Sequence, residues 1–246
     1  MNILFSLFAL LVIIVLAIIG VEVANLHFIF GVIIPYVAIA TFLIGIILQV
    51  IKWAKSPVPF RIPTVAGQQK SLPWIKNSRL ESPHTTLGVI GRMILEVFLF
   101  RSLFRNTKAE LKNGPTLVYG SSKYLWLGAL AFHWSFLIIF LRHFRYFTEP
   151  VPVFVPFIQN LDGFFQIGVP IIYLTDVVIV VALSFLFLRR IIDPKLRYFS
   201  LASDYFPLFL LLSIAITGIL MRYFTKVDIV GIKELAMGLF SFQPVV

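Results

Sequence analysis

Two histidines lie ten residues apart in one apolar segment of this chain. His133 and His143 both belong to the run of residues 123–147. An imidazole inside a membrane is costly unless it is paired or ligated, so these side chains are candidates for function. Ten helical residues rise about 15 Å and leave the two side chains about 80° apart. One histidine then lies near each leaflet, as two stacked haems would need. The alternative is two unrelated polar residues, with His143 at the membrane interface.

The composition is that of a membrane protein. Of the 246 residues, 59% are hydrophobic and 26 are Phe, whereas a soluble domain is close to half apolar. The absence of Cys excludes a cysteine-held iron–sulfur cluster or a covalent haem within this chain. The net charge of +10 does not indicate nucleic acid as a partner, because the basic residues cluster in connecting loops, as membrane topology requires.

Five apolar runs are each long enough to cross a membrane, which takes about 20 residues. The first run lacks the basic segment of a signal peptide, so we expect it to be retained. The sequence predicts an all-α integral membrane protein with about five transmembrane helices in a haem-binding bundle. The predicted spans are residues 2–20, 28–51, 123–147, 166–189 and 204–224.

Residues 84–105 are predicted to form an amphipathic helix on the cytoplasmic surface of the membrane or on a partner. Arg92 and Glu96 are four residues apart and can pair on one helix face. If this helix does not cross, residues 52–123 and 189–203 lie on one side and carry 16 of the 21 basic residues. The positive-inside rule places that side in the cytoplasm. We therefore expect a multi-pass protein of the cytoplasmic membrane with its N-terminus inside and His143 nearer the outer leaflet.

Three charged residues near the predicted spans could take part in chemistry. Arg142 and Arg145 flank His143 and could bind haem propionates, since a guanidinium matches a carboxylate; the alternative is snorkelling at a helix end. Asp176 is expected in the middle of the fourth span, where a carboxylate needs a partner or a proton. Asp176 could form a hydrogen bond between helices, or it could take part in proton transfer to or from a quinone.

The three later spans resemble the gamma subunit of respiratory nitrate reductase, a di-haem cytochrome b. The resemblance rests on the spacing of the two histidines, on the segment Arg189-Arg190-Ile-Ile-Asp193-Pro194, and on Asp204 at the start of the next helix. The loop of residues 59–76, with its Gln-Gln-Lys-Ser-Leu-Pro-Trp segment, is similar to that of the DsrM membrane cytochromes of DsrMKJOP-type complexes, which are linked to sulfite reduction. The additional N-terminal helix fits that subfamily too.

This resemblance implies an electron-transfer subunit of a quinone-linked oxidoreductase complex. Two b haems, held by His133 and His143, would carry electrons between menaquinol or menaquinone and a cytoplasmic iron–sulfur subunit resembling heterodisulfide reductase. Other membrane and outer-face subunits would complete a complex of sulfur-linked anaerobic respiration. The basic loop of residues 52–83, whose one acidic residue is Glu81, could dock the iron–sulfur partner; the alternative is that its charge orients the chain and touches anionic lipid.

The family pattern also divides the chain. Residues 1–27 are expected to form the additional helix and residues 28–225 the cytochrome b-like domain, including the cytoplasmic loop 52–122. In the family a final helix brings two further histidines, and residues 226–246 are interpreted as a tail without it. A truncated sequence or a separate chain would explain this difference. The remaining histidines, His27 and His84, could in principle complete the haems, or could be an interfacial residue and a helix N-terminal residue.

A second hypothesis is a non-redox membrane anchor or assembly subunit of a multi-subunit complex. An anchor needs no histidines within a span, whereas a transporter would more often show paired repeats or broken helices. The chain has no glycine-rich phosphate loop and no Ser/His/Asp arrangement, so neither a nucleotide-driven pump nor an ordinary hydrolase is indicated.

Overall fold

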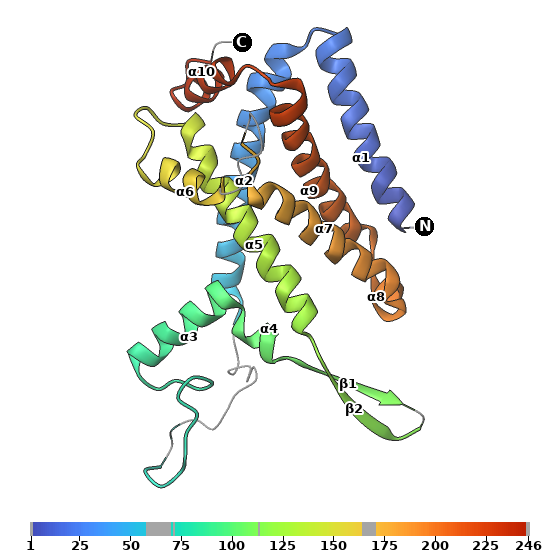
Figure 1. Ribbon diagram of the computed structural model, residues 1–246, viewed down its shortest axis with the longest axis vertical. Coiled ribbons are helices and arrows are strands. Elements are labelled where there is room, and N and C mark those ends of the chain that lie inside the picture. The colour runs from blue at the N-terminus through green and yellow to red at the C-terminus, as the bar shows by residue number, and fades with distance from the viewer. Residues whose placement is uncertain (1, 58–69, 71, 113, 164–170, 245–246) are drawn as a thin grey trace. The chain divides into compact units, whose positions relative to one another are not determined.

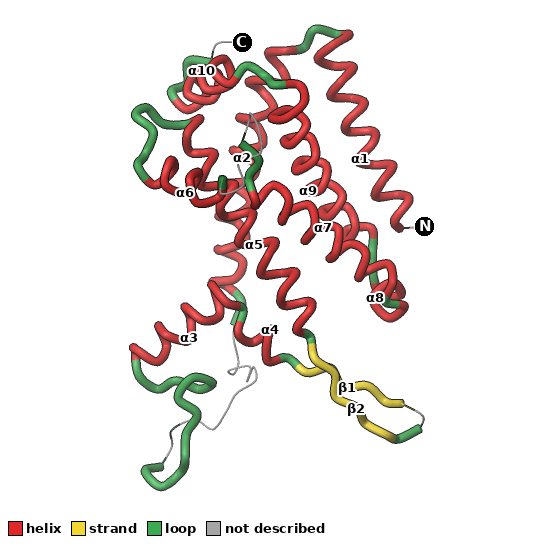
Figure 2. The backbone as a smooth tube through the Cα atoms, viewed as in Figure 1, coloured by secondary structure: helices red, strands yellow, loops and turns green. Residues whose placement is uncertain are grey.

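The structure is a computed structural model that describes residues 2–57, 70, 72–112, 114–163 and 171–244. The described part is mainly helical (Figure 2). It forms two compact units, one of Met1–Ala54 with Ala131–Val246 and the other of Lys55–Leu130.

Four helical segments in the described part are long and apolar enough to cross a membrane. The first is α1 (Asn2–Ile18) continued by η1 (Ile19–Val23), and the second is η2 (Ile29–Ile33) with α2 (Ile34–Lys55). The others are α5 (Lys123–His143) with η3 (Phe144–Tyr146), and α9 (Ala202–Leu220) with η4 (Met221–Thr225). These four agree with predicted spans and confirm the all-α membrane class.

The predicted fourth span differs from the structure. Helix α7 (Leu174–Ile192) is not one of the four segments and carries Asp176, Arg189 and Arg190. It begins later than expected, and residues 166–170 of the predicted span lie outside the described residues. Asp176 is therefore in the first turn of α7, not in its middle. Nineteen helical residues are about 28 Å long, so α7 is nonetheless comparable in length to a membrane core.

The two ends of α7 lie at the two ends of α9. At one end Tyr223 donates a hydrogen bond to Asp176 (2.8 Å), and at the other Arg190 lies 3.6 Å from Asp204. Helix α7 therefore runs alongside α9, which it contacts directly.

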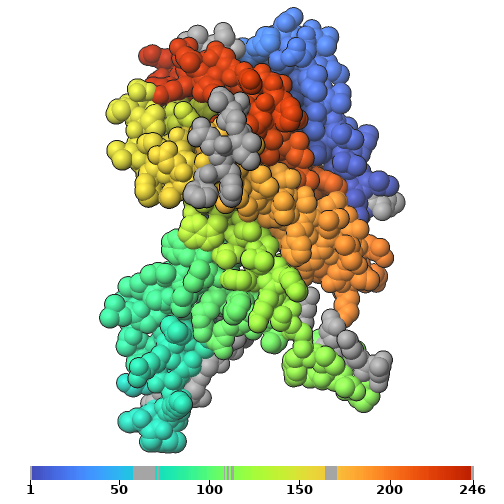
Figure 3. Space-filling model, in the orientation of Figure 1, coloured from blue at the N-terminus to red at the C-terminus, as the bar shows by residue number. Residues whose placement is uncertain are grey.

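Helix α9 packs between α1 and α7 (Figure 1; Figure 3). The contact with α1 is close at Ser6, which is 1% exposed and donates a hydrogen bond to the Ala202 carbonyl (2.9 Å). Asn2 donates to the Ser200 carbonyl (3.0 Å). Small residues with a satisfied hydroxyl are favoured where membrane helices approach closely. The starts of α1 and α9 therefore lie on the same side of this unit.

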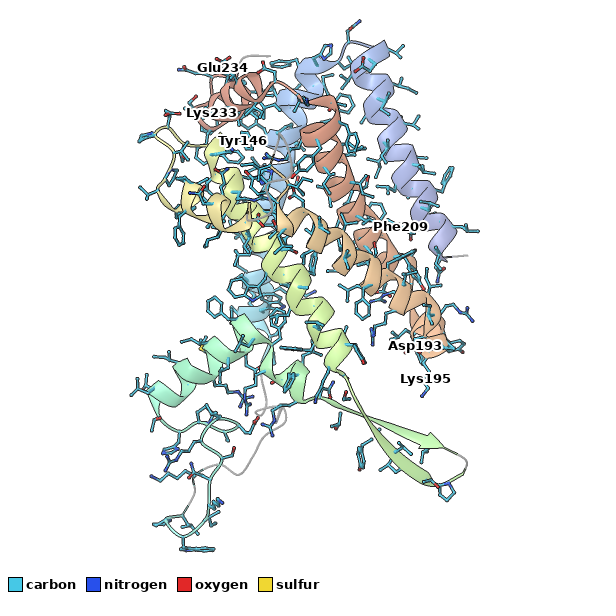
Figure 4. All side chains as sticks on the ribbon, in the orientation of Figure 1. Tyr146, Asp193, Lys195, Phe209, Lys233 and Glu234 are labelled. Carbon is cyan, nitrogen blue, oxygen red and sulfur yellow. The ribbon has the colours of Figure 1, made fainter. Side chains whose placement is uncertain are left out.

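Several residues that carry the family resemblance have a local structural role in the segment between α7 and α9. Asp193 accepts hydrogen bonds from the backbone of Lys195 and Leu196 and so caps α8 (Pro194–Phe199), where Pro194 occupies the first turn. Figure 4 labels Asp193 and Lys195 at this end of α7. Asp204 accepts from the Leu201 N–H (2.9 Å). These side chains set the turn between two helices.

Two further segments contain helices, one between the predicted third and fourth spans and one within the predicted tail. Within residues 149–170, α6 (Phe154–Asp162) is a short helix. Within 226–246, α10 (Ile229–Phe240) is capped by Asp228, and its Lys233 forms an ion pair with Glu149. Figure 4 labels Lys233 on α10 and Tyr146 beyond the end of α5. The Tyr36 hydroxyl donates to the Leu239 carbonyl (2.8 Å), which ties α10 to α2. At 12 residues α10 is too short to span.

The second unit holds the predicted amphipathic helix as two pieces. Helix α3 (Thr86–Leu99) ends at Phe100, whose φ of 48° is left-handed, and α4 (Arg101–Arg105) follows. The predicted pair of Arg92 and Glu96 is present at 4.0 Å. Glu81 is buried and pairs with Arg101 (2.6 Å) and with Arg105. This acidic residue of the basic loop therefore holds the loop against α4.

An antiparallel hairpin in the second unit was not predicted. Strand β1 (Thr107–Lys112) pairs with β2 (Thr116–Ser121) in the register Thr107↔Ser121. The connection of residues 113–115, Asn-Gly-Pro, is short and contains glycine, which is a hairpin signal that the sequence does carry. Residues 59–69 of the loop that resembles the DsrM cytochromes lie outside the described residues.

Glu96 connects the two helical pieces and gives a pH-dependent prediction. Its carboxylate accepts hydrogen bonds from the Ser102 backbone N–H (2.9 Å) and hydroxyl (2.5 Å). Burial alone would raise the pKa of Glu96, but the bonds from Ser102 and the charges of Arg92 and Arg101 outweigh it and lower the pKa below its ordinary value.

A carboxyl whose pKa is depressed by folding stabilises the fold at neutral pH, and this contribution is lost as pH falls through the folded pKa. We expect the Ser102 amide to stay protected from hydrogen exchange at neutral pH and to lose protection once pH drops below the lowered pKa of Glu96. In Glu96→Gln this pH dependence should be absent, after correction for intrinsic exchange. Equal pH profiles in the two proteins would contradict the assignment.

Candidate functional site

His133 and His143 both lie on the surface of α5 with their rings exposed. The His133 ring stands edge-on to Phe132, at 4.9 Å between centroids. Phe136 and Phe140 between the two histidines are also exposed, at 46% and 55%. This surface of α5 therefore offers two imidazoles in an apolar setting.

The hydrogen bond of His143 determines which ring nitrogen can act as a ligand. Its Nδ1 lies 2.6 Å from the carbonyl oxygen of Ile139, one turn earlier. Because a carbonyl only accepts, Nδ1 carries the proton, and Nε2 of the neutral ring keeps its lone pair. Histidines that ligate metals commonly donate their other N–H in this way. His143 thus presents an outward Nε2 suited to an axial ligand.

The other two histidines lie in different surroundings. His84 is two residues before α3, and its Nδ1 lies 3.3 Å from the Asn77 side-chain nitrogen. An amide N–H only donates, so Nδ1 of His84 accepts and the proton of the neutral ring is on Nε2. This arrangement agrees with a helix N-terminal role better than with ligation. His27 is exposed beside the turn that precedes η2.

Next to His143, Arg142 is buried in a network of charges and hydrogen bonds. Its guanidinium is 2.8 Å from Asp176 Oδ1 and 3.2 Å from Asp162 Oδ2. It also donates to the Thr175 hydroxyl (3.2 Å). Arg142 is 7% exposed and Asp162 6%. Two carboxylates therefore already neutralise this arginine.

The same carboxylates bind further donors. Asp162 accepts from the backbone N–H of Thr175 (2.9 Å) and from its hydroxyl (2.6 Å), and Asp176 accepts from the Tyr223 hydroxyl. A Cβ at Gly163 would come 2.9 Å from Ile171 Cγ2, so glycine allows α6 to end close to the segment that leads into α7. The network joins the ends of α5, α6 and α9 to the start of α7.

Tyr173 lies between two arginines of this network. Its ring centre is 3.8 Å from the guanidinium carbon of Arg142 and 4.3 Å from that of Arg222. Such cation–π contacts are strongest when desolvated, and Tyr173 is 5% exposed. Arg145, by contrast, lies 6.0 Å from the ring centre of Tyr146 and is half-buried.

The structure brings together some predicted residues and adds others. Arg142 and Asp176 are in contact, which confirms a helix–helix interaction for Asp176. Asp162, Tyr173, Arg222 and Tyr223 were not predicted to belong to a site. Asp162 and Tyr223 are ordinary residues near helix ends in the sequence, and only the pairing requirement of a buried charge could have suggested that partners for Arg142 exist.

The described residues fit an axially ligated haem better than a bare metal ion. They contain no group of three or more His, Cys, Asp or Glu that could hold a metal. A haem supplies its own four ring nitrogens and asks the protein for axial ligands and an apolar surface. His133 and His143 on α5 offer both, each as one ligand.

Removing the guanidinium of Arg142 should destabilise the protein strongly. In Arg142→Gln two buried carboxylates lose their cation, and breaking a buried pair in this way costs about 3–5 kcal/mol. The measurement is the free energy of unfolding of the purified complex in detergent. Arg197→Gln, at an exposed position of α8, is the matched control. A loss in Arg142→Gln no greater than the control's would mean that the network does not hold the helix ends together.

Comparisons with known proteins place the chain among membrane cytochromes. The nitrate reductase gamma subunit family matches residues 88–244. The "Hdr-like menaquinol oxidoreductase cytochrome b-like subunit" of Archaeoglobus fulgidus is 46% identical over 218 residues, which are 87% of this chain and 65% of the relative. The protein of the same name from Archaeoglobus profundus is 41% identical over 214 residues, which are 85% of this chain and 63% of the relative.

The chain thus spans slightly less than two thirds of the length of these curated relatives. No solved structure matches it at a significant level. The family match covers more than half of the chain and includes all of α5, α7 and α9. This protein belongs to the nitrate reductase gamma subunit family of membrane cytochrome b subunits.

Proposed function

We propose that this protein is a haem b subunit that passes electrons from menaquinol, across the membrane, to a cytoplasmic iron–sulfur subunit resembling heterodisulfide reductase. The observation that carries this proposal is the pair of exposed histidines ten residues apart on α5, with His143 held in the tautomer that leaves Nε2 free. The names of both Archaeoglobus relatives support menaquinol as the electron donor.

In this proposal His133 and His143 each supply one axial nitrogen to a b haem. A haem bound there provides a one-electron redox couple whose potential the axial ligands set. The second axial ligands would come from a further helix, of a longer chain or of another subunit, as in the family. Residues 1–27, 28–225 and 226–246 would then be the additional helix, the cytochrome domain and a tail.

Arg142 and Arg145, the two arginines near His143, have different proposed roles. Arg145 is proposed to bind a haem propionate with its guanidinium. Arg142 could do so only by giving up Asp162 or Asp176, both of which it contacts. We therefore propose that it also fixes the end of α5 and with it the position of His143.

The menaquinol site is proposed at the outer leaflet near His143 and Arg142. A groove of 380 Å³ with a wholly apolar lining lies between α2 and α10 and includes Phe147, four residues after His143. Pro35, Ile39 and Leu239 line it as well. Such a surface suits the hydrocarbon part of a quinol better than its polar head.

The proposed membrane topology follows from the positions of the basic residues. Residues 52–123 and 189–203 are placed in the cytoplasm, and the protein in the cytoplasmic membrane. The hydrogen bond from Asn2 to Ser200 supports a cytoplasmic N-terminus, because it ties the start of α1 to the second of these loops. The basic loop 52–83 is the proposed docking surface for the iron–sulfur subunit. Electrons would finally serve sulfur-linked anaerobic respiration, with other subunits completing the complex.

An optical difference spectrum tests this function directly. The purified complex, reduced with dithionite and compared with the air-oxidised state, should show two b haems per copy of this chain. His133→Leu and His143→Leu should each remove one haem, because each loses an axial ligand. His84→Gln should retain both. A wild-type complex without haem would overturn the proposal and favour the non-redox anchor.

A further inference from the structure

Arg222, on η4 beyond α9, is an arginine whose charge no carboxylate of the described residues neutralises. Its guanidinium lies over the rings of Tyr173 (4.3 Å) and Tyr223 (5.5 Å). Its Nε is buried and finds no hydrogen-bond acceptor in the described part of the chain. A buried donor left in this state is unfavourable, so the arrangement is incomplete without an acceptor.

The nearby aspartates do not supply that acceptor in the described structure, where their four oxygens bind other partners. Asp162 receives two hydrogen bonds from Thr175 and the charge of Arg142. Asp176 binds Arg142 through Oδ1 and the Tyr223 hydroxyl through Oδ2. The carboxylates are therefore committed to Arg142, and the positive charge that remains is that of Arg222.

The position of this charge indicates which anion it meets. Arg142 and Arg222 contact the same ring, that of Tyr173, and Arg142 immediately precedes His143 on α5. Arg222 thus lies at the same end of the helices as the outer histidine. A haem held by His143 would bring two carboxylates to this region, and a guanidinium pairs with a carboxylate through a planar fork of donors.

We propose that Arg222, backed by the ring of Tyr173, binds a propionate carboxylate of the haem held by His143. This inference rests on the proposed function. No sequence pattern marks Arg222 as a functional residue. The two arginines that contact Tyr173 then have separate roles. Arg142 binds the protein's own carboxylates, whereas Arg222 binds the carboxylate of the cofactor.

Redox potentiometry of the two haems in the purified complex tests the proposal. Arg222→Gln should lower the potential of one haem, because a nearby positive charge favours the reduced state and its removal leaves the propionate charge unbalanced. We expect about a tenfold shift in the reduction equilibrium, which is about 59 mV for one electron. The affected haem should be the one that His143→Leu removes. Arg222→Lys keeps the charge and should shift it less.

Lys226→Gln is the matched control, since Lys226 is an exposed cation four residues further on. It should leave both potentials unchanged. Should Arg222→Gln assemble poorly, haem-depleted wild-type complex can be reconstituted with haem b and with its propionate dimethyl ester. The ester should bind more weakly and show a raised potential, because it lacks the negative propionate charge while Arg222 remains.

Several results would overturn the inference while leaving the proposed function intact. Unchanged potentials in Arg222→Gln with two haems present would do so, as would equal binding of haem b and its ester. Loss of co-purified phospholipid from Arg222→Gln, without any shift in potential, would assign Arg222 to a lipid phosphate. A wild-type complex without haem would instead refute the proposed function itself.

Discussion

The described membrane unit depends on the ion pairs that the buried guanidinium of Arg142 forms with two carboxylates. Ions inside a membrane protein are stable only when they are paired and hydrogen-bonded. Arg142 meets Asp162 from α6 and Asp176 from α7, and Asp176 in turn binds Tyr223 from η4. Separating any of these elements would leave a charge without its partner in a medium that does not solvate it. The network therefore fixes where four segments begin or end, even though apolar contacts hold the helices along their lengths.

This constraint also explains how α7 tolerates three charged residues. Asp176 lies within its first turn and Arg189 and Arg190 within its last, so the part between them is apolar. Ile179, Ala182 and Leu183 in this part are all buried, and α7 contacts α9. An acidic residue near the start and basic residues near the end also complement the helix dipole. The charges mark the ends of the apolar segment, and their partners on α5 and α9 keep those ends level with the neighbouring helices.

The sequence alone predicted the membrane helices and the family, but it did not predict the network of charges around Arg142. Apolar runs predicted α1, α2, α5 and α9 closely, because length and hydropathy alone decide whether a helix can span. The same reasoning placed Asp176 too deep, since it could not show that the helix begins only at Leu174. It also did not predict α6, whose segment carries Pro152 and Pro156. The partners of Arg142 are 20 and 34 residues away along the chain, and such pairings depend on tertiary packing, which hydrophobic periodicity does not encode. His143 was found from residue type and spacing, but its tautomer follows from a carbonyl one turn away.

Because Arg142 and His143 are neighbours at the end of α5, the buried network also affects how the histidine is oriented. Successive residues of a helix point about 100° apart, so when Arg142 is held toward α6 and α7, His143 points to a different, adjoining side of α5. Its hydrogen bond to Ile139 then restricts rotation of the ring. An axial ligand must be held in one orientation before the cofactor arrives, since a loosely held ring would lose conformational freedom on binding. The buried charge of Arg142 and the exposed imidazole of His143, on adjoining sides of α5, are thus parts of one arrangement. The protein's own ion pairs hold the helix, and the ligand is presented on the face that they leave open.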